Sequence, residues 1–231
     1  MGKKVLLLVD IQNDFCTGGN LAVPNGEDVV PVANDLIDNG GYDLIVASLD
    51  WHPADHGSFV SQNPGKAPLD EIILSGQKQT VWPDHCIQDT EGADFHPDLK
   101  TEAIDFVQKK GTDPLVDSNS AFRDNLKERL TGLSDYLNDQ GVEEIHICGL
   151  ATDVCVKLSL LDAVELLPNV KVVFVEDASR GLSPEGVDAT KQEIAHFGIE
   201  TKNAAELIAE NKPAAPKTTP APKNAGKGFK R

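Results

Sequence analysis

The stretch Ile145–Cys155, IHICGLATDVC, places a cysteine at the junction of two predicted elements. The apolar run Ile145–Cys148 is typical of a buried strand that ends at Gly149, and a helical pattern of apolar residues begins near Val154. Cys155 therefore lies beside the unpaired N–H groups of a first helical turn, which favour the thiolate and lower the pKa of the thiol. A nucleophilic cysteine fits this position. Most free cysteines, however, are small buried apolar residues, and the stretch alone does not decide between the two.

Apolar segments of strand length recur along the chain and alternate with segments of helical periodicity. Strands are predicted at 5–9, 44–49, 104–107, 145–148, 170–175 and 199–202. Helices are predicted at 27–39, 122–137 with a break at Gly132, 154–167 and 184–197, and a capping-box pattern from Asn203 to Glu206 predicts a last short helix to about residue 209. This alternation favours an α/β fold of three layers (αβα), in which helices cover both faces of a mostly parallel, Rossmann-like sheet.

Length and composition divide the chain into one domain and a tail. Residues 1–210 are long enough for one domain with a full core, whereas 211–231 are rich in Pro, Ala and Lys and are expected to stay disordered. The tail holds six basic residues and no acid, which leaves 15 basic against 37 acidic residues in the domain. Such an acidic domain argues against binding to nucleic acid or to an anionic membrane. For the tail, a basic arm and a solvated appendage are both open, and its composition favours the appendage.

The chain shows neither an apolar signal segment nor a run of about 20 apolar residues. We therefore expect no transmembrane helix and a cytoplasmic location. The cysteines are expected to be free thiols in that compartment: Cys16, Cys86, Cys148 and Cys155. The sequence leaves the oligomeric state open, a homo-oligomer included.

Successive predicted strands are followed by an acid, an acid, a lysine and a cysteine: Asp10, Asp50, Lys110 and Cys155. Sites in parallel sheets form at the carboxyl ends of strands, so these four side chains are expected to meet. Asp10 could take the proton of the thiol as a base and return it to a leaving nitrogen as an acid. Burial would raise the pKa of Asp10, and a neighbouring Lys110 would oppose that shift. The constellation favours a cysteine nucleophile.

The long connection 51–98 starts beside a second group of candidates, Asp50-Trp51-His52, and contains His85. In an extended segment Asp50 and His52 point to the same side, and His85 would complete a metal site with positions open for water or substrate. One carboxylate with two imidazoles suits Zn²⁺, Mn²⁺ or Fe²⁺. The remaining histidines are interpreted as ordinary polar loop residues: His56, His96, His146 and His196.

These motifs resemble the isochorismatase-like cysteine hydrolases and, within them, the nicotinamidase and pyrazinamidase branch. The resemblance covers about residues 4–210 and rests on VDIQNDF at 9–15, DWHPADHGSF at 50–59, WPDHC at 82–86, Lys-Gly at 110–111, SAF at 120–122 and GLATDVCV at 149–156. It implies hydrolysis of a linear carboxamide, nicotinamide, to nicotinate and ammonia through a cysteine thioester, with pyrazinamide as a side substrate. This reaction would serve NAD salvage.

The resemblance also implies the reacting groups. The catalytic triad maps to Asp10, Lys110 and Cys155. The metal ligands map to Asp50, His52 and His85, with Ser58 as a weaker candidate, directly or through water, because some members have a histidine there. We expect one divalent ion, Zn²⁺ ahead of Mn²⁺ or Fe²⁺. The lysine is assigned from the glycine that follows it, and the neighbouring Lys109 is the alternative.

A further set of roles concerns the substrate. The family has a cis peptide bond at the place of Leu150–Ala151, and the N–H groups of Ala151 and Cys155 would form an oxyanion hole. Phe15 and Trp82 would flank a flat aromatic ring whose nitrogen faces the metal.

Other functions remain open at this point. Related enzymes act on N-carbamoyl or ureido compounds or on vinyl ethers. These enzymes generally lack the full set of Asp-x-His and a distant His. Bound metal would therefore distinguish a nicotinamidase from them. A binding or scaffold protein that keeps the fold without turnover is the alternative from another class. Nothing in the residues favours it, because every triad position holds a reactive side chain.

Overall fold

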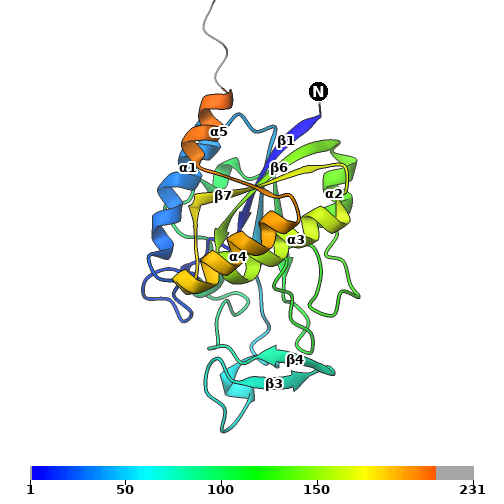
Figure 1. Cartoon of the computed structure of the whole chain (residues 1–231). Coiled ribbons are helices and arrows are strands. Elements are labelled where there is room, and N and C mark those ends of the chain that lie inside the picture. The colour runs from blue at the N-terminus through cyan, green and yellow to red at the C-terminus, as the bar shows by residue number, and fades with distance from the viewer. Residues whose placement is uncertain (1, 212–231) are drawn as a thin grey trace, which may run out of the picture.

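Six parallel strands form the centre of the computed structural model, which describes residues 2–211 (Figure 1). The strands are β1 (Lys3–Val9), β2 (Leu44–Asp50), β5 (Phe106–Lys110), β6 (Val142–Leu150), β7 (Lys171–Arg180) and β8 (Glu200–Lys202). They lie side by side in the order β5-β2-β1-β6-β7-β8, and each pair of neighbours is parallel. The mostly parallel sheet expected from the sequence is confirmed. The predicted disordered tail lies outside the described residues from residue 212 onward.

Helices cover both faces of this sheet (Figure 1). They are α1 (Val29–Asn39), α2 (Leu133–Asp139), α3 (Lys157–Leu166), α4 (Pro184–His196) and α5 (Ala204–Asn211). Alternate residues of β1 point to opposite faces: Leu6 packs in the apolar cluster that contains residues of α1 and α5, and Leu7 in the cluster that contains residues of α2, α3 and α4. Burial on both faces explains the continuous apolar runs of the strands. The three-layer αβα architecture is confirmed.

The strand order reverses direction at β1. From β1 the chain moves to β2 and then β5 on one side, and the later strands build the other side beginning with β6. In open parallel sheets, a crevice forms at the carboxyl ends of the strands where the order reverses. Asp10 directly follows β1, so it lies at this crevice.

The predicted helix 122–137 is wrong for most of its length. Only α2 is helical there, and residues 122–132 are irregular. The hydroxyl of Thr131 donates to the carbonyl groups of Ala121 and Phe122, at 2.7 and 3.2 Å. A continuous helix would hold residues nine or ten positions apart about 14 Å from each other, so these contacts are incompatible with a helix through residues 121–131.

The connection 51–98 contains an antiparallel hairpin that the sequence analysis did not predict. Its strands are β3 (Glu71–Leu74) and β4 (Gln77–Thr80), and Figure 1 shows it beyond the carboxyl end of the sheet. The chain leaves β4 two residues before Trp82. The strand predicted at 104–107 is shifted, because β5 begins at Phe106 and ends at Lys110.

Gly149, near the end of β6, has room only for a hydrogen. Its φ is +126°, and a Cβ atom there would lie 2.0 Å from the carbonyl oxygen of Val9. We expect Gly149→Ala to lower the free energy of unfolding by about 3 kcal/mol or more, because the backbone of β1 would have to move. Gly141→Ala is the matched control: φ is +71°, but a Cβ there meets nothing within 4 Å. This control should lose only about 1–2 kcal/mol. Urea unfolding measures both, and equal losses would contradict the close contact.

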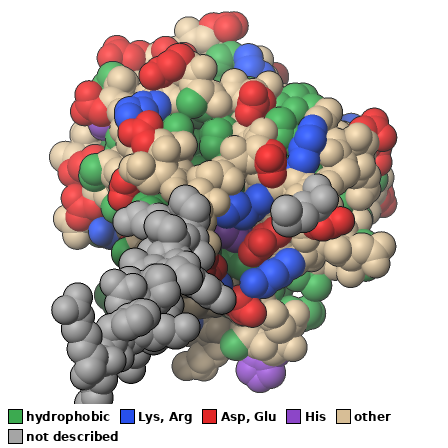
Figure 2. Space-filling view, turned by 90° about the horizontal axis from the view of Figure 1, so that it is seen from above, with side chains coloured by type: hydrophobic (Ala, Val, Ile, Leu, Met, Phe, Trp, Pro, Cys, Tyr) green, Lys and Arg blue, Asp and Glu red, His purple; other side chains and the backbone are tan. Residues whose placement is uncertain are grey.

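The surface at the amino ends of the strands is mixed in charge. Figure 2 looks onto this end and shows acidic and basic side chains interspersed over the visible surface. At the start of β7, for example, Lys171 lies 3.0 Å from Glu200 and 3.5 Å from Glu144. Within residues 2–211, none of the helices combines the length and the apolar character needed to cross a bilayer.

Candidate active site

Four reactive side chains lie next to one another at the carboxyl edge of the sheet. β5 ends at Lys110 and β2 ends at Asp50. β1 is followed by Asp10, and β6 leads into a π-helical turn, Thr152–Val156, that contains Cys155. Turns of this kind are frequent at functional sites. Because these strands are neighbours in the sheet, residues far apart in the sequence meet, as expected from their positions at strand ends.

The ammonium group of Lys110 lies at the centre of this group. Its Nζ is 3.0 Å from Asp10 Oδ2 and 2.9 Å from Asp50 Oδ1. It also donates to the carbonyl oxygen of Ser118 at 3.1 Å and to Cys155 Sγ at 3.5 Å. Burial alone would lower the pKa of Lys110, but the two carboxylates outweigh burial and raise the pKa well above its usual value. The ammonium therefore stays charged.

The neighbouring Lys109 points elsewhere. Its Nζ lies over the ring of Trp51, 3.4 Å from the ring centroid. Consecutive side chains of a strand point to opposite faces, so only one of the two lysines of β5 can face Asp10. The geometry favours Lys110 over the alternative that the sequence left open.

Burial governs the ionisation of the candidate nucleophile and its base. Burial raises the pKa of the Cys155 thiol well above its usual value, although Lys110 lowers it. The lowered pKa expected from the start of the helix is therefore wrong, because desolvation outweighs the opposing effect of Lys110. Burial also raises the pKa of Asp10, and Lys110 and Ser48 oppose that rise. A protonated thiol beside a buried carboxylate can use that carboxylate as its base.

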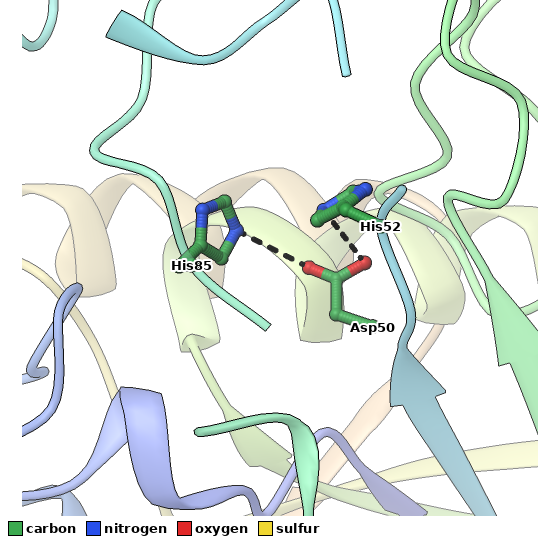
Figure 3. A group of neighbouring side chains, drawn as sticks. All are labelled: Asp50, His52 and His85. Atoms are coloured by element: carbon green, nitrogen blue, oxygen red, sulfur yellow. Dashed lines mark ion pairs between the residues drawn. The ribbon is translucent and has the colours of Figure 1, made fainter. Parts of the chain in front are cut away.

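Asp50, His52 and His85 form a cluster in which both imidazoles point at the carboxylate (Figure 3). His52 Nε2 lies 3.3 Å from Asp50 Oδ1, and His85 Nε2 lies 3.6 Å from Asp50 Oδ2. The other ring nitrogens donate to backbone carbonyls, His52 Nδ1 to Gly111 at 2.8 Å and His85 Nδ1 to Pro83 at 2.7 Å. When the imidazoles are neutral, these bonds place the proton on Nδ1 and the lone pair on Nε2, as in histidine ligands of metal sites.

The chemistry of this cluster fits a divalent cation. One carboxylate and two imidazoles offer ligand atoms within 4.8 Å of one another. Burial alone would raise the pKa of Asp50, but His52 and Lys110 hold it well below its usual value, so the carboxylate is ionised. Burial would lower the pKa of His52, yet Asp50 raises it to about 9. The cluster thus attracts positive charge, which a metal ion can supply in place of a proton.

Ser58 and two of the remaining histidines lie inside the protein. Ser58 Oγ is 2.8 Å from His56 Nδ1, and Ser58 is not among the described residues that line the pocket below. Ser58 as a metal ligand stays a prediction. His56 is fully buried with its ring 4.4 Å from that of His52, and His146 is buried within β6. The interpretation of His146 as a loop residue is therefore wrong, whereas His56 lies in a loop as predicted but is fully buried.

A pocket opens beside Cys155 and the candidate metal ligands. It contains about 370 Å³ of space, its open mouth included. Phe15 and Trp82, predicted to flank the substrate, both line it, and so does Ala151. The Leu150–Ala151 peptide bond is cis, as the resemblance implied. The predicted nucleophile, ring-binding residues and metal ligands therefore share one cavity.

The pocket also has walls that the sequence analysis did not single out: Leu21, Val23, Asp117, Asn119, Val154 and Leu182. A weak signal was available for Asp117 and Asn119, because both lie just before the SAF motif at 120–122. No sequence signal marked Leu182 as a pocket residue. The carboxylate of Asp153 accepts its backbone N–H at 2.9 Å.

Comparison with known proteins agrees with this site. The isochorismatase domain model matches residues 4–206. A nicotinamidase of Escherichia coli (strain K12) is 48% identical over 210 residues, covering 90% of this chain and 95% of that protein. The structure of an Acinetobacter baumanii nicotinamidase/pyrazinamidase matches with a TM-score of 0.85 at 36% identity, covering 90% of this chain and 99% of that one. The structure of a Pyrococcus horikoshii pyrazinamidase in complex with zinc matches with a TM-score of 0.71 at 34% identity, covering 87% and 99%. This chain belongs to the isochorismatase domain family.

Proposed function

We propose that this chain hydrolyses nicotinamide to nicotinate and ammonia, a step of NAD salvage, with pyrazinamide as a side substrate. The observation that supports this best is the position of Lys110, whose ammonium joins the carboxylate of Asp10 to that of Asp50. One charged group thus connects the proposed nucleophile and base with the proposed metal ligands. The nicotinamidase and pyrazinamidase relatives support the same substrates.

The pocket suits a flat pyridine carboxamide. Phe15 and Trp82 supply aromatic walls, which bury a ring at little conformational cost. With the ring between them, the carboxamide carbon would face Cys155 and the ring nitrogen would face the cluster of Asp50 and the two histidines. In this orientation the pocket would hold both ends of the substrate.

The first half of the reaction forms a thioester. Asp10 takes the thiol proton, and the sulfur of Cys155 attacks the carboxamide carbon, while the charged Lys110 holds both reacting groups in place. The backbone N–H groups of Ala151 and Cys155 would stabilise the oxyanion. The protonated Asp10 then gives its proton to the nitrogen, and the C–N bond breaks to release ammonia.

The second half restores the enzyme. Asp10, now a carboxylate again, takes a proton from a water molecule as the water oxygen attacks the thioester carbon. The C–S bond breaks, nicotinate leaves, and the proton held by Asp10 returns to sulfur. The same carboxylate thus serves as base and acid in the first half and again as base and acid in the second.

We propose Asp50, His52 and His85 as the ligands of one divalent ion, with Zn²⁺ first because a zinc complex is known for the pyrazinamidase relative. A bound ion would supply a fixed positive charge and a Lewis acid that orients the ring nitrogen. A cytoplasmic location and a homo-oligomer stay predictions.

The function is tested by measuring ammonia released from nicotinamide by protein of known metal content, before and after chelation. We expect release by the metal-loaded protein, a fall on chelation, and recovery when the metal is restored. Pyrazinamide, tested in parallel, should also release ammonia. No release from metal-loaded protein would overturn the assignment and direct attention to ureido and carbamoyl substrates.

The metal ligands are tested by affinity. We expect His85→Ala to weaken Zn²⁺ binding, measured by competition with a chelating dye, by about 100-fold or more, because loss of a partner behind a ligand already costs about 10–100-fold. His196→Ala is the control, since His196 is exposed at the end of α4 and should leave the affinity unchanged. Unchanged Zn²⁺ affinity in His85→Ala would remove His85 from the ligand set.

A further inference from the structure

A buried hydroxyl holds the carboxylate of Asp10 from the side opposite the ammonium. Ser48 Oγ donates to Asp10 Oδ1 at 2.6 Å, and Lys110 Nζ lies 3.0 Å from Asp10 Oδ2. Asp10 and Ser48 are both 0% exposed. Ser48 of β2 and Lys110 of β5 thus hold one carboxylate oxygen each, and the carboxylate is fully buried.

The two oxygens of Asp10 are not equivalent. Oδ1 accepts the hydroxyl proton of Ser48, whereas Oδ2 has an ion pair but no hydrogen bond of good geometry within residues 2–211. The ammonium beside Oδ2 also contacts Cys155 Sγ. Oδ2 thus shares this ammonium with the sulfur of Cys155 and has a lone pair free to take a proton.

The packing of β2 does not require a hydroxyl group at position 48. Its neighbours in the buried part of β2 are apolar, Ala47 before it and Leu49 after it, and alanine would fit the same pattern. A buried hydroxyl is costly unless it is hydrogen-bonded, and the side-chain hydrogen bond that Ser48 donates is the one to Asp10. Its local environment thus points to a role through that carboxylate.

We propose that Ser48 is a positioning residue that stops rotation of the Asp10 carboxylate and so reserves Oδ2 for proton transfer with the thiol and the leaving nitrogen. This inference rests on the proposed function. Ser48 does not line the pocket within the described residues, so it acts on the reaction through Asp10 and not through substrate binding. Its loss should lower kcat and leave KM nearly unchanged.

The test compares Ser48→Thr with Ser48→Val, which differ in the hydroxyl but share a similar shape and the same added bulk. With nicotinamide and saturating Zn²⁺, we expect kcat of Ser48→Val to be roughly 10–100-fold below that of Ser48→Thr, because a misplaced catalytic group costs about that factor. KM should differ by no more than about twofold. Ser48→Ala, which removes the oxygen without adding bulk, should show the same loss relative to the unsubstituted protein.

Thr190→Val controls for the loss of any buried hydroxyl, because Thr190 is 1% exposed and its hydroxyl donates to Gly186 within α4, away from the pocket. Its kcat should be unchanged. Thermal unfolding of each variant shows that the protein assayed is folded. Equal kcat values for the Thr and Val variants, unchanged kcat in Ser48→Ala, or a change confined to KM would overturn the inference. If the unsubstituted protein releases no ammonia, the proposed function fails first, and the two failures are thereby distinguished.

Discussion

Cys155→Ala is expected to lower kcat for nicotinamide by roughly 10⁴-fold or more, because no other group can form the thioester. Cys155 Sγ accepts from the ammonium of Lys110, and the residue lines the pocket. Removal of the sulfur leaves the aromatic walls and the metal ligands in place. Binding of the product nicotinate, measured by calorimetry, should therefore persist while ammonia release is lost.

Cys148→Ala is the matched control for this substitution. Cys148 is buried in β6, in the apolar cluster of the α1 and α5 face, whereas Cys155 belongs to the cluster of the opposite face. The control should lose some stability and keep its kcat. Ammonia release by Cys155→Ala at the rate of the unsubstituted protein would exclude Cys155 as the nucleophile and would require another group to attack the carboxamide.

Asp10→Asn is expected to lower kcat by roughly 10²–10⁴-fold, the usual contribution of a positioned acid or base. An amide keeps the shape of the side chain but cannot take the thiol proton or deliver it to the leaving nitrogen. Asp162→Asn is the control, because it also replaces a buried carboxylate, one paired with Arg123, at a place outside the pocket lining. It should affect stability and leave kcat within about twofold.

The pH dependence gives a second measurement on the same residue. Burial raises the pKa of Asp10, and the carboxylate is the form that accepts the thiol proton. Activity at saturating metal should therefore fall as the pH drops through that raised pKa, at a higher pH than an exposed aspartate would give. The small residual activity of Asp10→Asn should lack this fall. The same acid-side fall in the variant would assign it to another group.

The residues at the strand ends are the part of the site that the sequence could predict. Asp10, Asp50 and Cys155 each follow or end an apolar run, and parallel strands bring their carboxyl ends to one edge of the sheet. The Asp-x-His pair needed only the two-residue period of an extended segment. These predictions succeeded in placing the residues together because they depend on local pattern and on one general property of parallel sheets.

Contacts between segments far apart in the sequence could not be predicted from local pattern. Ser48 bonds a residue 38 positions away, and nothing in the apolar run of β2 marks its hydroxyl as a partner of Asp10. The helix expected at 122–137 is absent over residues 122–132, where Thr131 contacts the carbonyls of Ala121 and Phe122, and helical periodicity cannot anticipate such contacts. Leu182 lines the pocket, and the hydrogen bond from its N–H to Asp153, 29 positions earlier, has no counterpart in the local pattern.

The amino-acid pattern is enough to predict the αβα fold, the strand ends that hold the reactive groups, and the types of side chain available for a cysteine amidase with a metal site. The tertiary structure alone decided that Lys110 and not Lys109 faces Asp10, and that the thiol of Cys155 has a raised pKa and not a lowered one. The physical reason is the same in both cases. Local pattern specifies which groups a segment can present, whereas burial and charge–charge distances, which set their pKa values, exist only after separate segments pack together.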